Sequence, residues 1–136
     1  MNLSSADAIS AGFVLLVVVT IAYGGTFVLK VVTRKVPAND LQVSFYRAGH
    51  AHAGVLVILG LVVKILITTP GVPAWANTLS GGVLWAAILM PAGFFLSVLG
   101  REPAKPSRLI VLLWLGAASL TIGLVAAGIG LIMAGT

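Results

Sequence analysis

The chain has 136 residues, of which 60% are hydrophobic and 8% are charged, with a formal net charge of +5 and no cysteine. So few charges exclude an ordinary soluble domain, in which about a quarter of the residues are charged. Without cysteine there is no disulfide framework, thiolate metal site, iron–sulfur cluster or cysteine nucleophile. Nucleic-acid binding is not indicated either, because the basic residues cluster in short segments between apolar runs, a pattern typical of membrane orientation.

The first apolar run, residues 8–32, is predicted to be a membrane span. Ser4 and Asp7 precede it and are typical of a helix N-terminus. No basic segment comes before the run, so we expect a retained span rather than a cleaved signal peptide. The run ends near Lys30, and Pro37 then ends regular structure.

Three further spans are predicted at residues 48–69, 78–99 and 108–134. Each predicted span reaches the ~20 residues needed to cross a bilayer. The connections between them are short, so consecutive spans must pack as antiparallel neighbours. The sequence therefore predicts an all-α membrane protein in which residues 1–136 form a single domain, an antiparallel bundle of four transmembrane helices.

The basic residues predict how this bundle is oriented. Arg34 and Lys35 lie between the first and second spans, and Arg101 and Lys105 lie between the third and fourth. The remaining connection and the C-terminal segment carry no basic residue. The positive-inside rule then predicts a multi-pass protein of the bacterial cytoplasmic membrane, with both basic loops in the cytoplasm and both termini outside.

Small residues mark the helix faces where backbones approach closely in lipid. They recur at helical spacing on the second and fourth spans, at Gly49, Ala53, Gly60, Gly116, Gly123 and Gly130. The spacing fits packing within one bundle, self-association or contact with a partner subunit, and it does not separate these three uses.

Both histidines lie at the start of the second span, at His50 and His52, with Tyr46 and Arg47 before them and Lys64 further along. Residues two apart on a helix point about 200° apart, so one helix cannot chelate a metal with both imidazoles. Polar side chains at membrane depth are costly, which makes them candidates for function. For Lys64 we expect an anchor whose ammonium reaches the outer surface.

Three interpretations of the histidine pair stay open. In the first, each imidazole forms structural hydrogen bonds with a neighbouring helix. In the second, His50 and His52 bind haem or a transition metal, with a second copy of the chain or an unusual helix geometry completing the ligand set. In the third, His50, Tyr46 and Arg47 handle protons or a quinone at the inner leaflet.

The segment SFYRAGHAHAGVLVILGLV, residues 44–62, resembles a group of uncharacterised small four-span membrane proteins of actinobacteria with a RAGHAHAG-type motif. This resemblance covers nearly the whole chain and implies fold and location. More distantly, the H-x-H of His50 and His52 resembles histidine motifs of haem–copper membrane proteins, including oxidase-type subunits and the nitric-oxide-response family. The additional ligand histidines of those families have no counterpart in this sequence.

The carboxylates lie outside the predicted spans, at Asp7, Asp40 and Glu102, which disfavours a proton-coupled carrier. No arrangement of nucleophile and base and no phosphate-binding loop is recognisable, which disfavours an enzyme. The function predicted is therefore that of a non-enzymatic integral membrane protein, an accessory subunit of a larger, respiratory membrane complex. The alternatives are a haem- or metal-binding redox protein and an oligomeric channel or carrier. The expected partners are the lipid bilayer and a homo-oligomer or larger complex.

Overall fold

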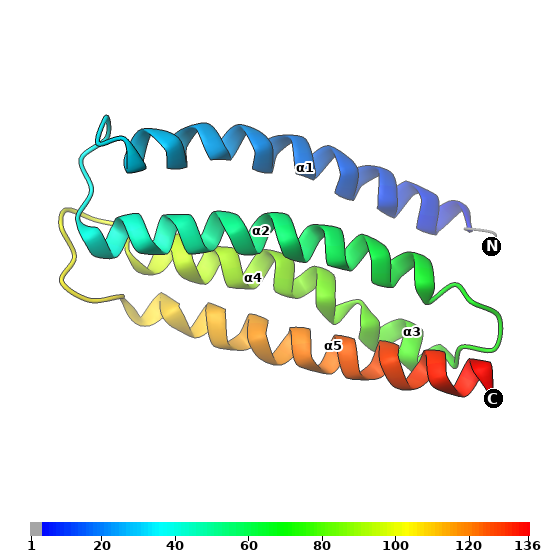
Figure 1. Ribbon diagram of the computed structural model, residues 1–136. Helices are drawn as coiled ribbons and strands as arrows, with labels where there is room; N and C mark the ends of the chain where they lie inside the picture. The colour runs from blue at the N-terminus through cyan, green and yellow to red at the C-terminus, as the bar shows by residue number, and fades with distance from the viewer. Residues whose placement is uncertain (1–3) are drawn as a thin grey trace.

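The computed structural model describes residues 4–136, and every regular element among them is a helix. In chain order these are α1 (Ser5–Val32), α2 (Asp40–Leu66), α3 (Ala74–Ser80), α4 (Gly82–Ser97), the short 3₁₀ helix η1 (Arg108–Ile110) and α5 (Val111–Gly135) (Figure 1). With α3 joined to α4 and η1 joined to α5, the described chain has 4 helical segments long and apolar enough to span a membrane.

The first two helices begin earlier than the predicted spans because polar side chains cap their N-termini. Ser4 Oγ accepts a hydrogen bond of 3.2 Å from the backbone N–H of Asp7, which starts α1 at Ser5. At α2, Asn39 and Gln42 form a capping box, in which each side chain accepts a hydrogen bond from the other residue's backbone N–H. Helix α2 therefore begins at Asp40, well before residue 48.

The third predicted span, residues 78–99, consists of two helices in the structure. Helix α3 ends at Ser80 and α4 begins at Gly82, so the interruption falls at Gly81. Pro91 lies inside α4, and the helix continues through it to Ser97. Pro91 is buried, so neighbouring helices cover the backbone at the point where proline removes a hydrogen-bond donor.

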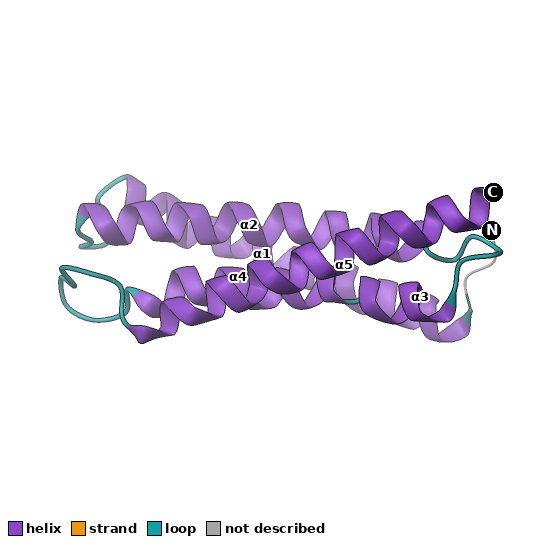
Figure 2. Ribbon diagram, turned by 90° about the horizontal axis from the view of Figure 1, so that it is seen from below, coloured by secondary structure: helices purple, strands orange, loops and turns teal. Residues whose placement is uncertain are grey.

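The long helices run along a common axis, and their connections gather at two ends (Figures 1 and 2). The α1–α2 connection and the loop after α4 lie at one end, which we call the loop end. The α2–α3 connection, the start of α1 and the end of α5 lie at the other (Figure 1). Helix α4 packs extensively against both α2 and α5, whereas α1 packs mainly on α2. Helix α4 is therefore the centre of the fold and α1 is peripheral.

Glycines make the contact between α5 and the α3–α4 segment close. A methyl group at Gly116 would lie 2.8 Å from the backbone nitrogen of Met90, and one at Gly123 would lie 2.8 Å from that of Val83. Gly130 faces Ala76 of α3 in the same way. All three glycines are buried. These glycines, spaced seven residues apart on the fourth span, therefore mark the face that packs inside this chain.

The small residues of α2 divide between two neighbours. Gly49 packs against the side chains of Phe94 and Phe95, and Gly60 packs against Leu84, so both lie in the α2–α4 contact. Ala53 instead lines apolar cavities that residues of α1, α2 and α4 border together. The small face of α2 is thus not one continuous seam against a single helix.

Large apolar side chains cover much of the outer surface. Phe13 on α1 and Trp114 on α5 are each 68% exposed, and many aliphatic side chains on all the long helices are exposed as well. In water such a surface would aggregate, whereas lipid chains solvate it. The exposed surface therefore suits contact with a lipid bilayer.

Candidate functional site

His50 points from α2 toward α1. A methyl group at Gly25 of α1 would lie 3.2 Å from Nε2 of His50, so the imidazole sits against bare backbone. The ring lines a cavity of roughly 210 Å³, whose other walls come from α1 and from Phe95 of α4. His50 forms no side-chain hydrogen bond with any described residue, and its ring borders this cavity.

His52 faces a different neighbour. Its Nδ1 lies 2.7 Å from the carbonyl oxygen of Ala48, one turn earlier on α2, and its ring is tilted against Phe94 of α4 with centroids 4.9 Å apart. The Nδ1–H therefore donates to that carbonyl, which leaves Nε2 as the nitrogen without a partner within this helix.

The structure does not bring the two predicted ligands together. His50 contacts α1 and His52 contacts α4, as expected for two side chains on opposite flanks of a helix. Within residues 4–136, no group of three or more His, Cys, Asp or Glu side chains is placed to hold a metal ion. A metal site built on this chain would therefore use one imidazole and take its remaining ligands from elsewhere.

Tyr46 and Arg47, predicted as polar neighbours of the histidines, have unlike surroundings. The Tyr46 ring is buried, stacked on Phe95 at 5.5 Å and edge-on to Phe27 at 5.4 Å. It therefore joins α1, α2 and α4 near the loop end. Arg47 is exposed and lies one turn before the histidines at the same end of α2.

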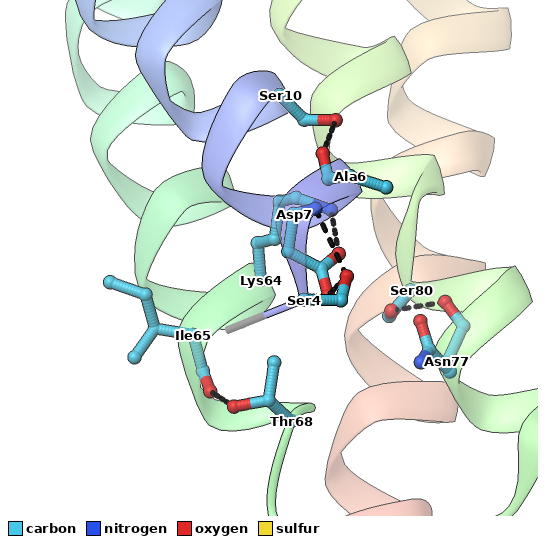
Figure 3. A network of polar contacts seen from close by, with 9 residues as sticks. All are labelled: Ser4, Ala6, Asp7, Ser10, Lys64, Ile65, Thr68, Asn77 and Ser80. Carbon is cyan, nitrogen blue, oxygen red and sulfur yellow. Dashed lines mark hydrogen bonds and ion pairs between the residues drawn. The ribbon is translucent and has the colours of Figure 1, made fainter. Parts of the chain in front are cut away.

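Lys64, expected to be an anchor, forms an ion pair that was not predicted from the sequence. Its ammonium lies 2.8 Å from Oδ1 of Asp7, and the hydroxyl of Ser4 donates to Oδ2 of the same carboxylate at 2.6 Å (Figure 3). The Lys64 and Asp7 side chains are only 22% and 31% exposed. Asp7, predicted to precede the first span, lies in the first turn of α1. The N-terminal end of α1 is thus joined to α2 by an ion pair.

A small polar region lies beside this ion pair. Lys64 lines a cavity of about 50 Å³ that also touches Asn77 and Ser80 of α3. Ser80 is buried and donates its hydroxyl hydrogen to the backbone oxygen of Asn77 at 2.7 Å (Figure 3). The break between α3 and α4 at Gly81 forms part of the same cavity.

Two amide side chains join the connections at the loop end. Gln42 donates hydrogen bonds of 3.0 Å to the carbonyl oxygens of both Val98 and Gly100. Asn39 donates to the carbonyl oxygen of Pro103 at 2.9 Å. These bonds fix the loop after α4 against the first turn of α2.

Reasoning from the sequence missed the partners of these polar groups. The pairing of Asp7 with Lys64 had a signal, because antiparallel spans bring the start of the first span level with the end of the second. Asn39 and Gln42 also had one, the spacing of a capping box. Gly25 had no distinguishing signal, since glycine is frequent throughout the chain.

Comparisons with protein-family models, with curated proteins and with solved structures found no match to this chain. The resemblance to small actinobacterial four-span proteins and to haem–copper proteins therefore stays a prediction.

Proposed function

We propose that this chain is a non-enzymatic subunit of a larger assembly in a bacterial cytoplasmic membrane. In this proposal its four spans form an antiparallel bundle, the two basic connections lie in the cytoplasm, and both termini lie outside. The four apolar helices support the membrane location.

One observation supports a structural role: several polar side chains form an ion pair or hydrogen bonds that hold one helix or loop to another. Lys64 of α2 pairs with Asp7 of α1, and Ser119 of α5 donates to the carbonyl oxygen of Gly82 in α4 at 2.9 Å. Gln42 links α2 to the loop after α4. In lipid, polar contacts of this kind fix which helices meet and in which register. A chain whose helices are held in this way is suited to present a fixed apolar surface to a partner subunit.

The proposed subunit role can be tested by site-specific photocrosslinking in the native membrane. A photoreactive residue at Phe13 or at Ile122, which are 68% and 54% exposed, samples the outer faces of α1 and α5. A subunit should give an adduct with one particular second protein from one of these faces. The matched control is Val83, which is 0% exposed and should give none. Adducts with lipid or with its own copies alone would contradict the proposal.

One specific observation favours a second candidate, a redox protein that uses His50. The His50 imidazole lines a cavity and has no hydrogen bond to a described residue, so one of its ring nitrogens is free to coordinate iron. The surroundings do not fit a complete haem–copper centre, because His52 faces another helix and its Nδ1 is occupied. An absorbance spectrum of the purified protein tests this candidate. A Soret band that His50→Ala removes and His52→Ala retains would support it, and a colourless preparation would exclude haem.

A further inference from the structure

A cavity of roughly 660 Å³ lies between the two basic connections at the loop end. Its walls come from Arg34, residues 36–39 and Gln42 on one side and from residues 100–102 on the other. Arg34 enters from the first connection and Arg101 from the second. Two arginines that are distant in the sequence therefore border one space, and the hydrogen bonds of Asn39 and Gln42 hold the two walls together.

The wall residues adopt unusual backbone conformations. Among the described residues, Arg34 and Glu102 are the non-glycine residues with positive φ, at 58° and 52°, and both line this cavity. Gly100, with φ at 121°, lines it too. Such conformations are unfavourable for residues with a side chain and persist where the surroundings hold them, which is frequent at ligand sites. Here they determine the direction in which the Arg34 side chain leaves its turn.

The charge of the protein is concentrated at this end. Seven of the eight basic side chains lie in the two connections or in the helical turns near them: Lys30, Arg34, Lys35, Arg47, Arg101, Lys105 and Arg108. Two carboxylates, Asp40 and Glu102, oppose them, which leaves +5, the whole formal net charge of the chain. Lys64 and Asp7 balance each other at the opposite end. The field around the cavity is therefore strongly positive.

The groups open to a ligand in this cavity are guanidinium groups. The amide side chains of Asn39 and Gln42 are engaged in the capping box and in the ties to the other loop. Arg34 donates from one terminal nitrogen to the highly exposed Asp40 at 3.1 Å and from the other to the carbonyl oxygen of Ala38 at 3.2 Å, and each of these nitrogens carries a second hydrogen. Arg101 forms no side-chain hydrogen bond or ion pair with a described residue. Guanidinium groups bind phosphate oxygens in a bidentate manner.

We propose that this cavity binds the phosphate group of an anionic phospholipid, with Arg101 and Arg34 as its ligands. The lipid is the expected source because the cavity lies between the connections that follow α1 and α4, where head groups lie in the proposed topology, and Lys30 in the last turn of α1 adds positive charge at this end. Glu102 on the wall disfavours a second negative group deep in the cavity, which points to a head group with a single phosphate. The site depends on this end being the cytoplasmic end in the proposed topology.

The test compares lipid binding to matched variants by native mass spectrometry from a neutral detergent. Dioctanoyl phosphatidylglycerol is the probe and dioctanoyl phosphatidylcholine the uncharged reference. Arg34→Gln combined with Arg101→Gln removes two charges from the cavity walls. Lys35→Gln combined with Lys105→Gln removes two charges from the same loops outside the cavity walls. We expect the arginine pair to lower phosphatidylglycerol binding tenfold or more and the lysine pair to lower it only about two- to threefold, by weakening the general field.

Equal losses in the two double variants would overturn the proposal, since they would show a diffuse basic surface without a site. Binding of inorganic phosphate as tight as that of phosphatidylglycerol would overturn the lipid source. The single variant Arg101→Gln controls for loss of folding in the double variant, because Arg101 forms no side-chain hydrogen bond or ion pair with a described residue. It should by itself weaken binding severalfold with an unchanged helical circular dichroism spectrum. None of these outcomes depends on whether a partner subunit exists.

Discussion

At the scale of single residues, the environment of His50 depends on the absence of a side chain at Gly25. The imidazole nitrogen would lie 3.2 Å from a methyl group there, closer than ordinary van der Waals contact. The histidine can therefore point to α1 only because that helix presents backbone at this level. The position of the imidazole therefore depends on Gly25 as well as on His50.

This close contact predicts coupling between the two positions. Gly25→Val should lower the free energy of unfolding by about 1–3 kcal/mol, the usual cost of overpacking a close contact. Adding His50→Ala should recover much of that loss, because the smaller side chain vacates the space. The measurement is thermal unfolding in detergent of the single and double variants. Gly12→Val is the control, since nothing lies within 4 Å of a side chain added at Gly12. Losses that simply add would contradict the contact.

At the scale of helices, α4 and α5 are held together by close approach of backbones. In lipid no hydrophobic force drives two helices together, so shape complementarity and polar ties must do so. Gly116 and Gly123 provide the shape, and Ser119, which donates to Gly82, provides a tie. This contact should consequently be the most sensitive to added volume.

Gly123→Leu should therefore separate α5 from α4 and greatly lower the yield of folded protein. Gly128→Leu places the same side chain on the same helix at a position where nothing lies within 4 Å, and it should be tolerated. Resistance of α5 to limited proteolysis in detergent measures the difference. If both variants resisted proteolysis like the original chain, the close α4–α5 contact would be refuted.

Helix α1 is held differently, because it packs mainly on α2 and the Asp7–Lys64 ion pair fastens one of its ends. Lys64→Met should free that end of α1 and speed hydrogen exchange in its first turns, while the α4–α5 contact keeps its protection. Lys30→Met also removes a lysine, at the other end of α1, where Lys30 forms no ion pair with a described residue, and serves as the control. Unchanged exchange in Lys64→Met would show that the ion pair does not hold the helix.

At the scale of the whole molecule, the number of helical segments long enough to span a membrane could be predicted, because span length and apolar content are local properties of the sequence. The face that each helix turns inward was harder to predict. Lipid-facing and buried side chains of a membrane span are both apolar, so the pattern says little about rotation. For α5 the glycine spacing indicated a packing face but not its partner, and the structure shows that Gly116, Gly123 and Gly130 are buried within the chain.

The residues of the candidate site could be predicted from the sequence, but the residues that each of them contacts could not. Nothing in the local pattern placed His50 against Gly25 or joined Gln42 to the loop after α4, because these contacts depend on helix rotation and on the path of a distant loop. The cavity between Arg34 and Arg101 likewise exists only once both connections reach the same end of the fold.

The most direct test of the whole account is cysteine accessibility across the membrane. The chain has no cysteine, so single variants at Pro37, Val72 and Ala104 each report one connection without background. A thiol reagent that cannot cross the membrane, applied to intact cells, should label the Val72 variant and should label the Pro37 and Ala104 variants only after the cells are opened. Labelling of all three from the same side would contradict the four crossings and the proposed place of the phosphate site.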